Sequence, residues 1–135
     1  MMTSLLPVTL LAMQVGQVAP PDLDAVAAAP NNHRVILEND QVRVLQVTVM
    51  PGETEAVHEH RWPSVIHIQS WQPALDIRYA VRDGKLVEVD RTRLPAGAPP
   101  AAIWAPNEAP HAVTNLGKAP FRLLRVELKQ PVVGK

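Results

Sequence analysis

Apolar and polar residues alternate in short runs along most of the chain after residue 34. In the clearest run, residues 74–81, every second side chain is apolar: Leu75, Ile77, Tyr79 and Val81. A period of two is typical of a strand with one buried face. Asp83 and Gly84 follow directly, and this pair favours a two-residue hairpin turn. The pattern therefore predicts a hairpin whose second strand covers residues 85–90.

Further runs rich in β-branched residues lie between turn residues and proline. The sequence predicts about eight strands in all, at residues 35–37, 42–50, 64–71, 74–81, 85–90, 103–104, 111–115 and 121–128. Proline occurs 14 times in 135 residues, and proline interrupts helices. Short strands at regular spacing, without a convincing helix, indicate an all-β sandwich or barrel.

Composition narrows the class of protein. With 135 residues the chain has the length of one domain. Its 13 basic and 13 acidic side chains cancel, so it lacks the basic surface of a nucleic-acid-binding protein. Hydrophobic residues make up 47%, enough to form a core. The absence of cysteine excludes disulfides, thiolate metal ligands and cysteine nucleophiles.

The first 30 residues differ from the rest, since they contain no Lys or Arg. Residues 5–13 form an apolar stretch that is too short for a transmembrane helix. Two interpretations remain open: a secretory signal peptide, or a loose N-terminal arm that packs on a partner or on the barrel. We therefore expect an arm or signal peptide at residues 1–30 and a barrel domain at residues 31–135, in a protein that is cytoplasmic or exported.

Three of the five histidines have the spacing of a metal site. His58 and His60 stand two residues apart, so on a strand both imidazoles point to the same face. His111 begins another predicted strand. Three imidazoles from two strands can bind one divalent ion and leave positions open for water or substrate.

The surroundings of these histidines strengthen this interpretation. Residues 52–60 fit the pattern G-x5-H-x-H, and residues 106–115 fit most of P-x-G-x-x-H-x3-N. Over residues 35–128 the chain resembles the small single-domain bacterial cupins. This resemblance implies a double-stranded β-helix, or jelly-roll barrel. It also implies one divalent metal ion (Fe, Zn, Ni or Mn) held by His58, His60 and His111.

The sequence departs from the cupin pattern at two positions relevant to the metal. Ser64 and Val65 stand where the family usually has a glutamate ligand, and Glu108 stands where it usually has glycine. Three neutral imidazoles leave the ion its full charge, which favours Lewis-acid chemistry or an anionic chelating substrate. The same departure is consistent with a weakened metal site.

Other candidate residues follow from the strand at residues 64–71. If Val65 points inward, then His67 and Gln69 share its face. His67 is then a fourth ligand or a general base; the alternative is a buried histidine bonded to the barrel wall. Gln69 and Trp104 are candidates for substrate binding. His33, near the end of the arm, is expected at the surface.

Two main functions remain open. The protein is a metal-dependent enzyme acting on a small organic molecule, by dioxygenase or by isomerase or lyase chemistry. Alternatively it is a non-catalytic module that binds a metal or small molecule, or a barrel that has lost its metal. The small size of the barrel and its sheet edges favour a homodimer.

Overall fold

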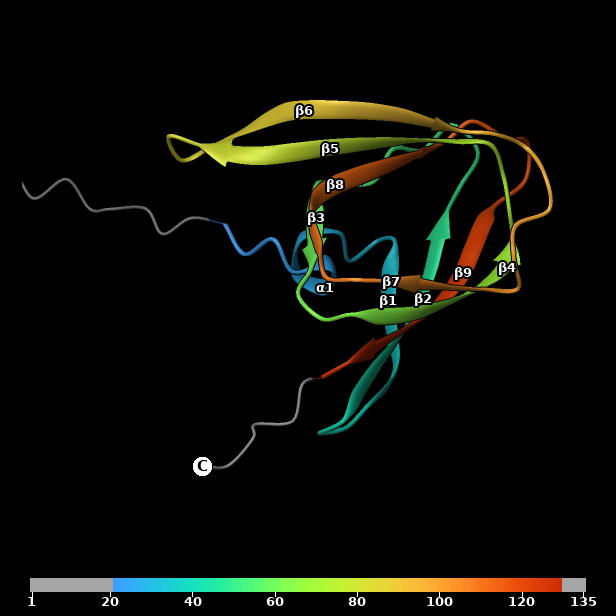
Figure 1. Ribbon diagram of the computed structural model, residues 1–135, viewed down its shortest axis with the longest axis horizontal. Coiled ribbons are helices and arrows are strands. Elements are labelled where there is room, and N and C mark those ends of the chain that lie inside the picture. The colour runs from blue at the N-terminus through green and yellow to red at the C-terminus, as the bar shows by residue number, and fades with distance from the viewer. Residues whose placement is uncertain (1–20, 130–135) are drawn as a thin grey trace, which may run out of the picture.

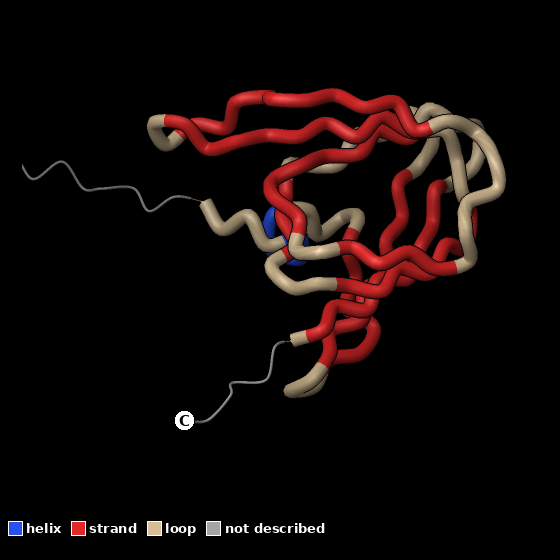
Figure 2. The backbone as a smooth tube through the Cα atoms, viewed as in Figure 1, coloured by secondary structure: helices blue, strands red, loops and turns tan. Residues whose placement is uncertain are grey.

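A computed structural model describes residues 21–129. Apart from a single helical turn, all regular elements of the described chain are strands (Figure 2). The elements are α1 (Ala25–Ala28), β1 (His33–Glu38), β2 (Val42–Val49), β3 (His58–His60), β4 (Ser64–Ser70), β5 (Ala74–Arg82), β6 (Lys85–Leu94), β7 (Ala102–Ala105), β8 (Glu108–Asn115) and β9 (Phe121–Leu128).

The strands form two antiparallel sheets that face each other (Figure 1). One sheet has the order β1-β2-β9-β4-β7, and the other has the order β3-β8-β5-β6. The all-β prediction is confirmed, and all eight expected strands are present. The structure adds β3, which is too short to show an alternation of its own, and α1.

Local sequence explains the longest hairpin. Asp83 and Gly84 adopt positive φ angles of 50° and 73°, the conformation that a tight turn between twisted strands requires. Arg82 pairs with Lys85 directly across this turn. The hairpin of β5 and β6 extends well beyond the rest of its sheet (Figure 1).

The barrel interior is closed at one end by apolar packing. Val49, Ala74 and Phe121 are buried there, from β2, β5 and β9. Asn115 is fully buried beside them. Its amide donates to the carbonyls of Val49 and Ala119 at 2.9 and 2.8 Å. The bond to Val49 joins the end of β8 to the end of β2 in the opposite sheet, and the bond to Ala119 fixes the loop before β9.

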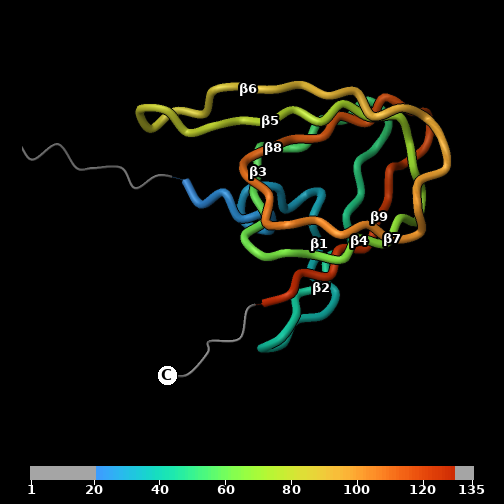
Figure 3. The backbone as a smooth tube through the Cα atoms, viewed as in Figure 1, coloured from blue at the N-terminus to red at the C-terminus, as the bar shows by residue number. Residues whose placement is uncertain are grey.

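The described part of the expected N-terminal arm packs on the barrel (Figure 3). Asp24 caps α1 by accepting from the amide of Val26 at 3.1 Å, and Ala25 and Ala29 are buried. The backbone of Leu23 accepts a hydrogen bond from the amide of Glu59 in β3. Residues 1–20, which include the candidate signal peptide, lie outside the described residues. Within residues 21–129, no helix is long and apolar enough to span a membrane.

Candidate metal centre

Four histidine rings converge inside the barrel. They come from β1, β3 and β8: His33, His58, His60 and His111. The ring centroids of His58 and His60 are 5.1 Å apart. The ring of His111 lies 4.5 Å from that of His58 and 5.6 Å from that of His60. The structure thus brings together the three histidines selected from the sequence and adds His33.

Strand geometry explains how β3 presents its two histidines. His58 and His60 are buried, whereas Glu59 between them is partly exposed and bonded to Arg61. The shared face expected from the two-residue spacing is therefore confirmed. His111 is the direct partner of His58 in the pairing of β3 with β8, which brings its ring to the same place.

Each of the four rings is anchored through its Nδ1 atom. The Nδ1 atoms of His58 and His111 lie 2.9 Å from the carbonyl oxygens of Ala56 and Ala109. The remaining two contacts are His33 Nδ1 to the carbonyl of Ala29 at 3.2 Å and His60 Nδ1 to Glu127 Oε1 at 2.8 Å. A carbonyl or carboxylate oxygen can only accept, so Nδ1 carries the proton. The Nε2 lone pair of each ring is left free.

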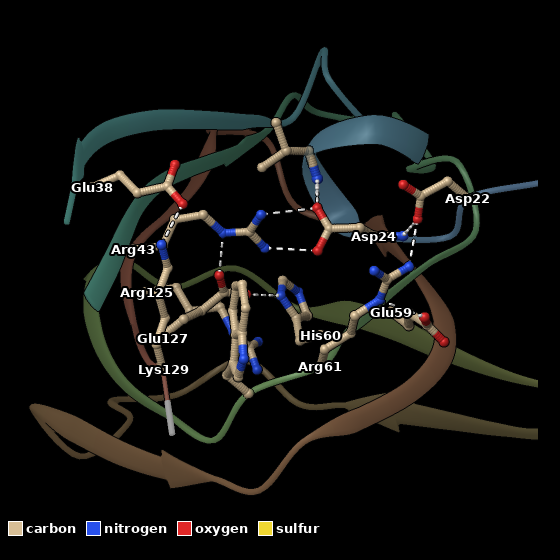
Figure 4. Close-up of polar contacts among 12 residues, drawn as sticks. Asp22, Asp24, Glu38, Arg43, Glu59, His60, Arg61, Arg125, Glu127 and Lys129 are labelled. Carbon is tan, nitrogen blue, oxygen red and sulfur yellow. Dashed lines mark hydrogen bonds and ion pairs between the residues drawn. The ribbon is translucent and has the colours of Figure 1, made fainter. Parts of the chain in front are cut away.

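His60 is held by a chain of buried charges (Figure 4). Glu127, which is fully buried, accepts from His60 with one oxygen and from Arg43 Nε with the other, at 2.5 Å. The other two nitrogens of Arg43 donate to both oxygens of Asp24 at 2.9 Å. The N-terminal segment is thereby connected to a ring of the cluster through two ion pairs.

Burial keeps the rings of His33, His58 and His60 uncharged. Burial, reinforced by the neighbouring histidines, lowers the pKa of His33 to about 2. Burial and the nearby ring of His111 lower the pKa of His58 to about 4, and burial also lowers the pKa of His60 far below its usual value. These three imidazoles are neutral at pH 7, the form in which an imidazole binds a metal ion.

The donor set fits a divalent cation. Ligand atoms of His33, His58 and His60 lie within 4.8 Å of one another, and so do those of His60, Glu108 and His111. The two sets share His60. Neutral imidazole nitrogens and a carboxylate oxygen are ligands for Zn, Fe, Ni and Mn ions.

A buried arginine adjoins the cluster. The guanidinium of Arg125 lies 2.6 Å from Glu108 Oε2, although this ion pair is not aligned as a hydrogen bond. Its Nε donates to the hydroxyl of Ser64 at 3.0 Å. Ser64 occupies the position where the sequence lacks a carboxylate, and Glu108 supplies one from the opposite sheet. Sequence reasoning missed the closeness of Glu108 to His60 and His111, because Glu108 stood out only as a departure from a motif.

The histidines face a pocket of about 370 Å³. Its walls are mainly apolar, with Ile66, Ile68, Phe121 and Leu123 among the lining residues. Glu55 also lines the pocket, and burial raises the pKa of its carboxyl to about 8. An apolar cavity with a few polar groups at one end is the usual form of a small-molecule site.

The structure does not bring His67 or Gln69 into this pocket. In β4, Ser64 and Ile66 are buried, while Val65, His67 and Gln69 are exposed. The inward orientation assumed for Val65 is therefore wrong, because Ile66 and Ile68 occupy the inner face. His67 contacts the carbonyl of Ala101, at 3.1 Å through Nδ1, and Gln69 accepts a hydrogen bond from Gln46.

Two further expectations concerned the positions of Trp104 and His33. Trp104 lines the pocket but is 60% exposed, so it lies at the pocket's edge. His33 is only 3% exposed, and the expectation of a surface position is wrong. It pairs with Val47 of β2, which is a buried position. No pattern in the sequence could reveal this pairing.

Comparison with known proteins shows the fold. No family model matches the sequence, and no curated protein matches it. A solved cupin domain from Bordetella pertussis superposes with a TM-score of 0.52 and 21% identity, over 73% of this chain and 92% of that one. The protein has the cupin fold.

Another solved structure also matches: a protein from Klebsiella pneumoniae with a double-stranded β-helix domain. It superposes with a TM-score of 0.46 and 23% identity, over 73% of this chain and 76% of that one. The similarity to the Bordetella pertussis domain and the two antiparallel sheets confirm the double-stranded β-helix that the resemblance to cupins implied. Identities this low establish the cupin fold alone and leave the reaction to be argued from the site.

Proposed function

We propose that this cupin binds one divalent metal ion through His58, His60 and His111 and acts on a small organic molecule in the adjoining pocket. The observation that supports the metal site is the set of Nδ1 contacts to oxygen atoms. These contacts fix the tautomer and orientation of each ring before any ion binds, so the free Nε2 atoms are ready to serve as ligands.

In this proposal the histidines bind the metal ion, and the residues that line the pocket bind the substrate. When bound, the ion supplies Lewis-acid or redox chemistry, which suits an isomerase or lyase and a dioxygenase respectively. The apolar walls around Ile66 and Leu123 exclude water and bind the carbon skeleton of the substrate. Arg125 lies beside the cluster and offers a charged donor for an anionic group. Trp104 borders the entrance.

A non-catalytic binding module is the second candidate. The observation that favours it is the position of His67 on the outer face of β4. This orientation removes the histidine that the sequence had offered as a proton carrier beside the metal. A cupin that only binds a metal ion or a small molecule needs no such group.

Metal analysis of the protein purified without added metal tests the site. We expect about one divalent ion per chain, and we expect its loss in His58→Ala, His60→Ala and His111→Ala. His67→Ala is the matched control and should keep the ion, since this ring lies outside the cluster. Full metal content in His111→Ala would contradict the proposed ligand set.

Substrate screening then separates the candidates. Oxygen uptake by the iron-loaded protein with small diketones, phenols or thiols indicates a dioxygenase. Turnover without oxygen uptake indicates Lewis-acid chemistry. Binding of small molecules without turnover across a broad panel favours the binding module.

We also propose that the protein forms a homodimer. The four-stranded sheet ends at β6, whose side chains from Lys85 to Arg93 are all exposed. Leu86, Val87 and Val89 are among them. An exposed edge strand with apolar side chains can pair with a second copy of the chain. Light scattering should give twice the 14.8 kDa mass of one chain, and a monomeric mass would refute the dimer.

A further inference from the structure

We infer that His33 is a fourth imidazole ligand of the metal ion. This inference rests on the proposed metal site and extends it to a residue from β1. His33 stands 25 residues before His58, outside both histidine motifs. Its place in the cluster therefore comes from the fold alone.

The first argument is the symmetry of the cluster. The ring of His33 lies 4.4 Å from that of His58 and 5.4 Å from that of His60. The corresponding distances for His111 are 4.5 and 5.6 Å. The ring of His33 is thus about as close to the rings of His58 and His60 as the ring of His111 is, which supports His33 as a ligand alongside His111.

The second argument is the state of the ring. The side chain of His33 is only 1% exposed, and its Nδ1 contacts the carbonyl of Ala29 at the end of α1. Its Nε2 therefore bears the lone pair. The nearest acidic atom to Nε2, Glu55 Oε1, is 3.8 Å away, which is too far for a hydrogen bond. Among residues 21–129, Nε2 of His33 makes no hydrogen bond that would compete with a metal ion for its lone pair.

The third argument is the distance between the possible ligand atoms of the histidines. One ligand atom from each of His33, His58 and His60 lies within 4.8 Å of the others. Three nitrogens bound to one ion at about 2.1 Å lie roughly 3.0–3.6 Å apart, so closing this set from 4.8 Å needs each ring to move by up to about 1 Å. Glu108 is a weaker candidate for the fourth position, because its carboxylate is already paired with Arg125.

Cobalt(II) is a suitable probe because its spectrum reports the number and kind of its ligands. The affinity of the full chain for Co²⁺ is measured by competition with a chelator, together with the visible absorption spectrum. His33→Ala should lower the affinity at least about tenfold and alter the spectrum. Exogenous imidazole, which fills the space left by the ring, should restore the spectrum. The control His67→Ala should match the unaltered protein.

Proton NMR of the Co²⁺-loaded protein counts the ligands without any substitution. Each ring that binds through Nε2 keeps an Nδ1 proton, which gives a strongly shifted signal that exchanges with water. We expect four such signals in the unaltered protein and three in His33→Ala or, if that variant does not fold, in His33→Gln.

The outcomes distinguish this inference from the metal site itself. Three signals in the unaltered protein, or unchanged affinity and spectrum in His33→Ala, overturn the role of His33 while His111→Ala still loses the ion. If the unaltered protein binds no Co²⁺, both the metal site and the inference fail.

Discussion

Glu127 provides the sharpest test of how the cluster is held. It is fully buried, and both its oxygens are used. One accepts from Nδ1 of His60 and the other from Nε of Arg43. The substitution Glu127→Gln keeps the size of the side chain but replaces one acceptor oxygen with an NH₂ donor. Only one of the two former partners can then find an acceptor.

The expected loss of stability in Glu127→Gln follows from the burial of this side chain. If the amide oxygen stays with Arg43, the amide nitrogen donates to Nδ1 of His60, and the proton of that ring moves to Nε2, where it blocks metal binding. Arg43 also loses one of its two buried countercharges. Removing one partner of a buried ion pair costs about 3–5 kcal/mol, a large part of the roughly 5–15 kcal/mol stability of a typical domain.

Urea denaturation of the metal-free protein measures the loss in the free energy of unfolding. Glu38→Gln is the matched control, because its carboxylate accepts from Lys129 at 2.7 Å but lies at the surface, where the pair contributes at most about 1 kcal/mol. We also expect metal affinity to fall about 10- to 100-fold in Glu127→Gln alone. If Glu127→Gln destabilised the protein no more than the control, the buried chain of charges would not hold the cluster.

Three further predictions concern buried polar groups. Burial lowers the pKa of His33 and His58 to about 2 and about 4, whereas unfolded histidines titrate near pH 6.5, so the unfolded state binds protons first. As the pH is lowered below 6, the free energy of unfolding of the metal-free protein should therefore fall by more than about 1 kcal/mol per pH unit in urea titrations. The control His67→Gln should show the same dependence on pH. Glu55, whose pKa is raised to about 8, has the opposite effect on stability. The carboxyl ionises near pH 4.5 in the unfolded chain, so the folded protein loses stability as the pH rises from 4.5 towards 8. Glu55→Gln should stabilise the protein relative to the unaltered chain by about 2 kcal/mol more at pH 7.5 than at pH 5.5, and an equal effect at both values would contradict the raised pKa. Asn115→Ala should cost about 2–4 kcal/mol in thermal or urea unfolding, since it leaves buried carbonyls unpaired; a loss below about 0.5 kcal/mol would show that water replaces the amide.

The sequence by itself determined the features that depend on neighbours along the chain. Alternation at residues 74–81 predicted β5, and Asp83-Gly84 predicted its hairpin, because strand faces and tight turns follow from local backbone geometry. The two-residue spacing of His58 and His60 placed both rings on one face for the same reason. Resemblance to the cupin motifs then supplied the barrel and the third histidine.

Only the tertiary structure decided which side chains from distant parts of the sequence come into contact. In β4, both Val65 and Ile66 are apolar, so the pattern could not choose the inner face, and packing of Ile66 and Ile68 inside turned His67 outward. His33 enters the cluster because β1 pairs with β2. Glu127 reaches His60 from 67 residues away. Such contacts depend on sheet order and burial, which no local spacing encodes.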